Sequence, residues 1–131
     1  LHQRHLLEAV EQRDWGKLAN LLADDYTDHW GFDKQTAPPA AQKAFSQFMF
    51  LTVRTENPQW DFGKNSARFM ANLKVQGSGG PLTEIVEDHV NSLRGPFTFE
   101  WVHRSWKPWD WKLSTVEQEE LKIPDVDTLP L

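Results

Sequence analysis

The spacing of the apolar residues changes once along this chain, and that change limits the fold more than any other feature. Up to about Leu51, apolar residues recur every three or four positions, as on one face of an α-helix. Beyond Leu51 they alternate with polar residues in several segments, as in a strand with one buried face. Helices followed by strands predict an α+β domain in which three N-terminal helices pack against an antiparallel sheet.

The stretch 6–32 predicts two helices separated by a break, followed by a short strand. Asp14 is a suitable N-cap at the break, because its carboxylate can accept from the free amide groups of the next turn. The apolar residues that follow fall on one helical face: Trp15, Leu18, Leu21 and Leu22. Aromatic and β-branched residues then predict a strand at about 26–30.

The rest of the chain predicts a third helix and then a run of strands. Two prolines after Ala37 suit the first turn of a helix, which is expected to end near Leu51. Gly- and Pro-containing turns, among them a hairpin turn at 77–81, separate five expected strands: roughly 59–62, 66–76, 82–93, 96–106 and 110–117. Residues 1–122 are therefore expected to form one domain, and 123–131 a loosely packed tail.

Composition excludes several kinds of function. The 131 residues suffice for one domain with a core, and the net charge of −5, without clustered Lys and Arg, argues against nucleic-acid binding. With no cysteine, disulfides and thiolate chemistry are excluded. No run approaches the ~18 apolar residues of a membrane span. Because the chain begins with Leu1 rather than Met, we expect a trimmed or mature form, and the compartment, an upstream signal peptide or an anchor stay open.

The run D-W-x-x-L-x-x-L-L-A-D-D, from Asp14 to Asp25, resembles the nuclear-transport-factor-2-like superfamily. Its ketosteroid-isomerase-like and polyketide-cyclase-like branches are the most similar, and the resemblance covers nearly the whole chain. It implies a strongly curved antiparallel sheet wrapped around the helices as a cone with an apolar cavity. Members of the superfamily include isomerases, dehydratases, cyclases, epoxide hydrolases, non-enzymatic ligand binders and association domains, so the fold leaves the activity open.

Two positions depart from the steroid isomerases of that superfamily. Their first-helix Tyr and their general-base Asp align with Leu6 and Trp30 of this chain. Steroid isomerisation needs a base and an oxyanion donor, so this particular activity is not expected. A dehydratase-like arrangement of one Asp with His partners also occurs in the superfamily, but its motif has no match here.

Asp88 and His103 form the candidate catalytic pair. In a strand over 82–93, Asp88 would share a face with Val86 and Val90, where a carboxylate among apolar neighbours suits acid–base chemistry. His103 continues the face of Phe97, Phe99 and Trp101, so we expect it to meet Asp88 across adjacent strands. The alternative is structural, with Asp88 hydrogen-bonded to a strand or an Arg and His103 half buried.

The candidate ligand-binding residues are mostly aromatic. Alternation along a strand allows only one of Asp28 and His29 to point into the cavity. The expected cavity wall comprises Trp30, His29, Phe45, Phe69 and Trp101. The tryptophan-rich run 101–111 has two interpretations, a ring-stacking platform or core and subunit interface. The scattered His and Asp residues have no metal-ligand spacing, so neither a metal nor a cofactor is expected.

These patterns favour a small-molecule-binding domain whose apolar cavity takes a small apolar or aromatic ligand. Two alternatives stay open: a lyase- or isomerase-type enzyme that uses Asp88 and His103, and a protein-association module. We also expect a homodimer through the sheet, with Trp106 or Trp109 near the contact. The reason is that apolar residues on both faces of the later strands leave more apolar surface than three helices can cover.

Overall fold

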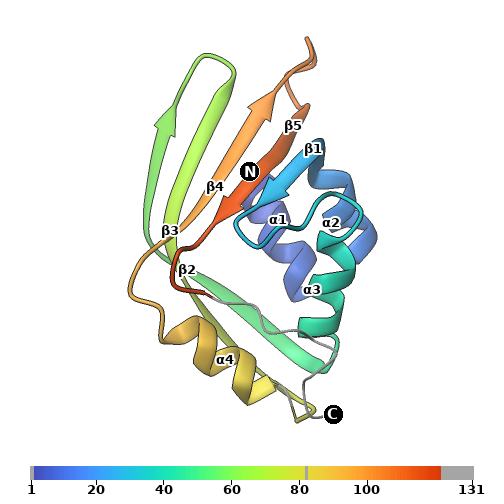
Figure 1. Ribbon diagram of the computed structural model, residues 1–131, viewed down its shortest axis with the longest axis vertical. Helices are drawn as coiled ribbons and strands as arrows, with labels where there is room; N and C mark the ends of the chain where they lie inside the picture. The colour runs from blue at the N-terminus through green and yellow to red at the C-terminus, as the bar shows by residue number, and fades with distance from the viewer. Residues whose placement is uncertain (1, 82, 122–131) are drawn as a thin grey trace.

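The computed structural model describes residues 2–81 and 83–121, which form four helices and one five-stranded sheet (Figure 1). The helices are α1 (His2–Glu11), α2 (Trp15–Leu21), α3 (Ala37–Phe45) and α4 (Thr83–Asn91). The strands are β1 (Leu22–Asp28), β2 (Phe48–Phe62), β3 (Ser66–Gly79), β4 (Phe97–His103) and β5 (Trp111–Glu117). The predicted α+β class is confirmed, whereas the predicted tail 123–131 lies outside the described residues.

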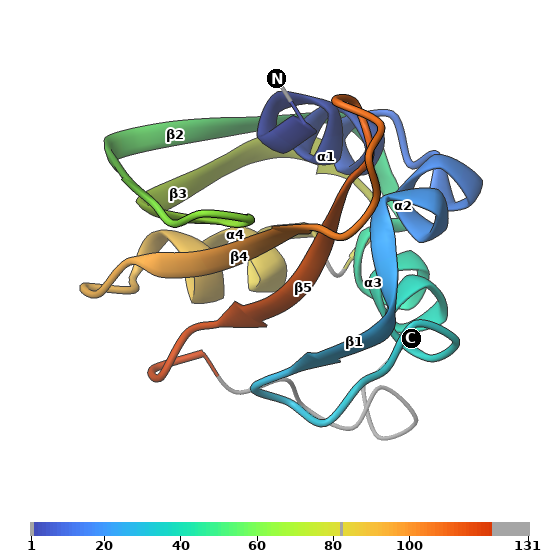
Figure 2. The ribbon, with the colours of Figure 1, turned by 90° about the horizontal axis from the view of Figure 1, so that it is seen from above.

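The sheet has the strand order β1-β5-β4-β3-β2 and curves around α1, α2 and α3 without closing (Figure 2). The strands β2 to β5 pair antiparallel, as predicted, but β1 pairs parallel with β5. Alternation of apolar and polar residues shows which face of a strand is buried and carries no information about its direction, so the sequence did not reveal this pair. Each of the described helices is too short or too polar to cross a membrane.

The break between the first two helices forms as predicted. The Asp14 Oδ1 atom accepts a hydrogen bond from the Lys17 backbone N–H at 3.1 Å and caps α2. Arg13 has a φ angle of 53°, in the left-handed region where helices commonly end. Its guanidinium donates to the Met49 carbonyl at 3.1 Å, so the break is attached to β2.

The third helix is shorter than predicted, and the strand after it is longer. The helix α3 ends at Phe45, and β2 runs without interruption from Phe48 to Phe62. The pairing of β2 with β3 shifts at a β-bulge between Glu56 and Gln59, with Asn57 at a φ angle of 54°. The helix prediction was wrong beyond Phe45 because the spacing of Phe45 and Phe48 fits a helix, while burial alternates over 51–54 as in a strand.

The segment 82–93, predicted as a strand, contains the helix α4. The error has a simple cause: Val86 and Val90 are four residues apart, and that spacing places two side chains on one face of either a helix or a strand. The Gly-rich run before it is not a hairpin turn. Gly77 and Gly79 belong to β3, where a Cβ atom would lie 2.2 Å from the Phe50 backbone oxygen and 1.9 Å from that of Gln47, so only glycine fits.

Side chains of α4 replace a strand along the free edge of β3. Only residues 66–71 of β3 pair with β4, which leaves the backbone groups beyond them unpaired on that side. The Asn91 amide accepts from the Val75 N–H at 2.7 Å and donates to the Val75 carbonyl at 2.8 Å. The Glu87 Oε1 atom accepts from the Gly77 N–H at 2.6 Å. The polar face of α4 therefore satisfies this edge and fixes the helix against the sheet.

We expect the substitution Asn91→Ala to lower the free energy of unfolding by about 1–3 kcal/mol, because it leaves both backbone groups of Val75 without their partner. Urea unfolding of both proteins measures the change. Ser92→Ala is the matched control, because Ser92 directly follows α4 and its hydroxyl donates to the nearby His89 carbonyl rather than to β3. Equal losses in the two variants would contradict the role assigned to Asn91.

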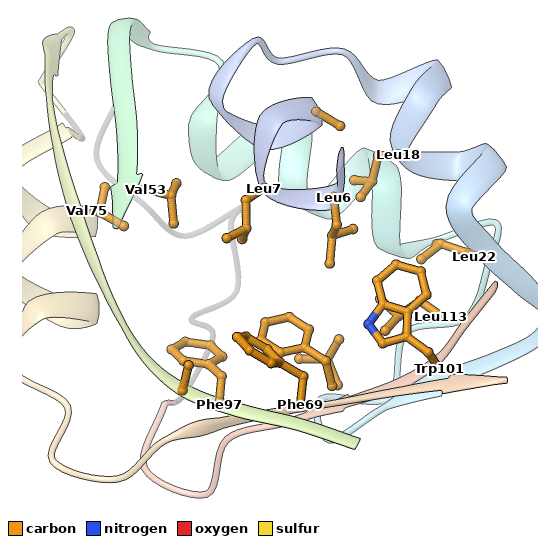
Figure 3. Packing of buried hydrophobic residues seen from close by; sticks show 14 of the residues in the cluster. Leu6, Leu7, Leu18, Leu22, Val53, Phe69, Val75, Phe97, Trp101 and Leu113 are labelled. Atoms are coloured by element: carbon orange, nitrogen blue, oxygen red, sulfur yellow. The ribbon is translucent and has the colours of Figure 1, made fainter. Parts of the chain in front are cut away.

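The core lies between α1, α2 and the concave face of the sheet. Figure 3 shows Leu6 and Leu7 of α1 pointing toward Phe69 and Phe97, which stand on β3 and β4. Other members of the buried cluster come from every strand of the sheet: Leu22, Val53, Val75, Trp101 and Leu113. Helices on one face and alternating strands on the other are what the change of hydrophobic period predicts.

Candidate functional site

An apolar cavity of about 300 Å³ lies between the helices and the concave face of the sheet. Its volume is at the lower end of the range typical for small-molecule sites. All four helices and all five strands contribute to its wall. Side chains on opposite sides include Leu7, Val10, Ala44, Phe45, Val75 and Phe97. The preformed cavity implied by the resemblance is thus present.

One polar pair lies in this wall, on β1. The Tyr26 hydroxyl donates to the Asp28 Oδ2 atom at 2.9 Å, and the Tyr26 side chain is only 5% exposed. Burial raises the pKa of Tyr26, and the neighbouring Asp28 charge and hydrogen bond raise it further. The Tyr26 hydroxyl therefore keeps its proton and donates it in the hydrogen bond to Asp28.

The other oxygen of Asp28 organises the turn that follows β1. The Oδ1 atom accepts from the backbone N–H groups of Trp30 and Phe32, each at 3.0 Å. Gly31, between them, has a φ angle of 87°, which suits glycine. The Trp30 indole N–H in turn donates to the Leu121 carbonyl at 2.7 Å. An Asp side chain that binds nearby backbone amides thus holds two aromatic rings against the cavity.

The structure places Asp88 and His103 on different elements, α4 and β4, so the expected pairing across two adjacent strands does not form. On the helix α4, Asp88 is two positions from Val86 and Val90, which turns its side chain away from theirs and leaves it exposed. His103 ends β4, at the opposite end of that strand from α4. Its ring stacks on Trp111 with centroids 5.0 Å apart, and its Nε2 atom contacts the Lys107 carbonyl.

The acidic neighbour of His103 is Asp110 instead. The pKa of Asp110 is held below its ordinary value, chiefly by a hydrogen bond with Ser105 and further by the nearby Lys112, Lys107 and His103. This cluster lies around the connection 104–110 between β4 and β5, and none of its members lines the cavity. It stabilises a surface loop.

Of the five predicted ligand-binding residues, two line the cavity and three do not. Trp30 and Phe45 line the cavity. His29 does not: it is exposed beyond the end of β1, with its ring nearly perpendicular to that of Trp30, and Asp28 takes the inward position. Phe69 and Trp101 are buried in the packed core, and the Trp101 indole N–H donates to Gln3 Oε1 at 2.9 Å. For Trp101 the core interpretation is therefore confirmed.

The sequence interpretation missed Tyr26, Phe32 and His89, which all line the cavity. A signal for Tyr26 was available, because residues two apart on a strand share a face and Asp28 was already a candidate. His89, on α4, had no such signal, because that segment was assigned to a strand. Over residues 2–81 and 83–121, no three His, Asp or Glu side chains lie together as a metal site would require.

Comparison with known proteins defines the fold. No protein-family model matches the sequence, and no curated protein matches it. A solved NTF2-like protein from Cytophaga hutchinsonii is similar in structure, with a TM-score of 0.60, 16% identity, and coverage of 88% of this chain and 89% of that chain. A type 2 hexachlorocyclohexane dehydrochlorinase, LinA, gives a TM-score of 0.63 and 16% identity, with coverage of 88% and 78%.

A third similar structure is a longer protein. Bd1075 from Bdellovibrio bacteriovorus has a TM-score of 0.66 and 13% identity over 88% of this chain, which spans only 36% of the length of Bd1075. Identities this low show a shared fold and leave activity open. The chain has the nuclear-transport-factor-2-like fold, as its resemblance predicted.

Proposed function

We propose that this nuclear-transport-factor-2-like domain binds a small, mostly apolar molecule in its cavity. The observation that carries the proposal is an apolar space of about 300 Å³ with a single hydrogen-bonded Tyr–Asp pair in its wall. Protein interiors otherwise contain few voids larger than a water molecule. Burying apolar surface away from water is favourable, so an apolar molecule in this space gains free energy by removing its own surface and that of the cavity wall from water.

The similar structures support the class of ligand. One of them is named as a dehydrochlorinase of hexachlorocyclohexane, a small and apolar molecule. The same likeness supports a second candidate, a lyase-type enzyme, in which a molecule in the cavity would meet Tyr26, Asp28 and His89. Asp88 and His103 have no place in that candidate. Conversion of a bound compound, followed by mass spectrometry, separates the enzyme from a binding protein.

A neutral fluorescent probe tests the proposal directly. N-phenylnaphthylamine is apolar, bicyclic with one further ring, and brightens when it leaves water for an apolar site. We expect a saturable rise in its fluorescence with one site per chain. Native mass spectrometry of the protein purified from cells should also show a bound small molecule in part of the population. A linear, unsaturable response together with a ligand-free mass spectrum would overturn the proposal.

The apolar surface available for a homodimer differs from the one predicted. The outer face of β3 and β4 is polar, where Arg68 donates two hydrogen bonds to Glu100, at 2.7 and 3.0 Å. Large apolar side chains are exposed elsewhere, at the ends of strands, on α4 and in the connection 104–110: Met49, Phe50, Trp60, Phe62, Ile85, Trp106 and Trp109. Trp106 and Trp109 are 82% and 64% exposed.

We therefore propose that the homodimer forms around the connection 104–110, and the dimer itself stays a prediction. Replacing both Trp106 and Trp109 by Ser should convert dimer to monomer in sedimentation velocity at micromolar concentration, because exposed aromatic side chains concentrate the binding energy of interfaces. Lys107→Ser, in the same connection, is the control and should leave the dimer intact. A wild-type protein that sediments only as monomer would contradict the proposal.

A further inference from the structure

We infer that the cavity selects neutral molecules that carry a hydrogen-bond donor, such as a hydroxyl or N–H group, over ethers, carbonyl compounds and anions. The inference rests on the proposed function and names the chemical class of its ligand. It follows from the direction of the hydrogen bonds around Tyr26 and Asp28, the polar pair of the cavity wall.

The only proton of the Tyr26 hydroxyl is already in use. A phenol has one O–H donor and can also accept, and here the donor points at the Asp28 Oδ2 atom, 2.9 Å away. The raised pKa of Tyr26 keeps that proton in place. What the hydroxyl still offers to a ligand is its lone pairs. A ligand group that meets Tyr26 must therefore donate.

Hydrogen bonds to both carboxylate oxygens hold Asp28 in one orientation. Its Oδ1 atom holds the backbone N–H groups of Trp30 and Phe32, so the carboxylate is anchored by the turn as well as by Tyr26. A carboxylate accepts hydrogen bonds and has no donor. Its free lone pairs present the same acceptor chemistry as the hydroxyl. Both members of the pair therefore favour a donating ligand.

The N–H donors near the pair are also occupied. The backbone N–H groups of Trp30 and Phe32 bind Asp28, and the Trp30 indole N–H binds the Leu121 carbonyl at 2.7 Å. A ligand carbonyl or ether oxygen placed here would be buried beside acceptors without a partner. Leaving a buried polar group unpaired costs more than a normal hydrogen bond contributes.

An anion is disfavoured more strongly. Among the described residues that line the cavity there is no Lys or Arg, so a carboxylate or sulfonate placed beside Asp28 would meet neither of these cations there. An isolated charge in an apolar site is costly unless it is paired. His89 is the other polar side chain among the described residues of the wall. It lies on α4, which packs beside β3, whereas the Tyr26–Asp28 pair is on β1, and β5 and β4 stand between these strands in the sheet.

Three probes with one ring system separate these possibilities. Naphthol, methoxynaphthalene and naphthoate, each substituted at the same ring position, present a donor, an acceptor without a donor, and an anion. Their dissociation constants are measured by displacement of N-phenylnaphthylamine from the wild-type protein. We expect methoxynaphthalene to bind about 5- to 10-fold more weakly than naphthol, the range for one buried hydrogen bond, and naphthoate more than about 100-fold more weakly.

Substitutions in the cavity wall test whether the preference for a donating ligand arises from the Tyr26–Asp28 pair. In Asp28→Asn the amide oxygen can still accept from Trp30 and Phe32, while the NH₂ group faces Tyr26 and donates to it. The Tyr26 proton is then free for a ligand, so the preference for naphthol over methoxynaphthalene should fall to about twofold or less. Tyr26→Phe removes the hydroxyl and leaves the Asp28 carboxylate as an acceptor, so the preference for naphthol should persist. His89→Leu tests the other polar side chain of the described wall and should also keep the preference.

The outcomes distinguish this inference from the function on which it rests. If N-phenylnaphthylamine binds and methoxynaphthalene or naphthoate matches naphthol, the inference is overturned and the binding function stands. If His89→Leu removes the preference while Asp28→Asn keeps it, the inference is also overturned, because the donor is then recognised elsewhere. If N-phenylnaphthylamine and all three naphthalene compounds fail to bind, the proposed function itself is wrong.

Discussion

Replacing Trp101 by Ala is expected to lower the free energy of unfolding by about 3–5 kcal/mol, the usual range for truncating a buried Trp. The side chain is only 2% exposed and belongs to the packed cluster between α1 and the sheet. Its loss opens a cavity and removes the indole N–H that binds Gln3 Oε1. Gln3 is itself buried and its Nε2 atom has no hydrogen-bond partner, so the truncated protein would hold a wholly unsatisfied amide.

Urea unfolding with two further variants distinguishes packing from the hydrogen bond. Trp101→Phe keeps most of the apolar area but loses the N–H, and should cost about 1–3 kcal/mol. Phe50→Ala is the matched control: this Phe is 72% exposed, and its removal should change stability by about 0.5 kcal/mol or less. If Trp101→Ala is as mild as Phe50→Ala, Trp101 is not the core residue that the structure shows.

Trp101 also illustrates what strand alternation can and cannot predict. The sequence correctly placed Phe97, Phe99 and Trp101 on one face of a strand, and all three are buried. It did not show whether a given position on that face borders a cavity or solid packing. Phe97 and Phe99 line the cavity and Trp101 does not, because that depends on which helix lies opposite. Periodicity predicts on which face of a strand a residue lies. Whether that residue borders the cavity or packed side chains depends on the elements that pack against this face.

The segment 82–93 shows the same limit at the level of secondary structure. Val86 and Val90 fit either a helix or a strand, so the hydrophobic pattern was ambiguous there. Local chemistry favoured the helix, since the acidic Glu84 lies in its first turn, where a negative charge suits the helix dipole. The wrong choice removed His89 from consideration and placed Asp88 beside His103. One ambiguous period thus accounts for most of the error in the candidate site.

The Tyr26–Asp28 pair is the part of the site that the sequence could have predicted. Both residues belong to a predicted strand, and two-residue spacing places them on one face. The backbone turn that fixes Asp28 contains Gly31, and the Trp30 side chain beside it is held by the carbonyl of Leu121, 91 residues further along the chain. That long-range contact is a property of the folded sheet, and no local pattern encodes it.

Blocking the cavity should abolish ligand binding and leave the fold intact. Ala44 lies on α3 and lines the cavity, so Ala44→Trp would place an indole in a space of about 300 Å³. A clash worth about 3 kcal/mol or more corresponds to a loss of affinity for N-phenylnaphthylamine of at least roughly 100-fold. Filling an apolar void commonly contributes about 0.5–2 kcal/mol of stability, so thermal unfolding should occur at an equal or higher temperature.

The matched control for this variant lies on the same helix. Gln42 is exposed and does not line the cavity, so Gln42→Trp adds the same ring on the solvent side and should preserve binding. Loss of binding with retained stability in Ala44→Trp alone assigns the probe to the cavity, because a general unfolding would lower both. If Ala44→Trp binds the probe as well as Gln42→Trp does, the ligand site lies elsewhere on the molecule. An unchanged affinity in a stably folded Ala44→Trp protein would therefore refute the proposed site.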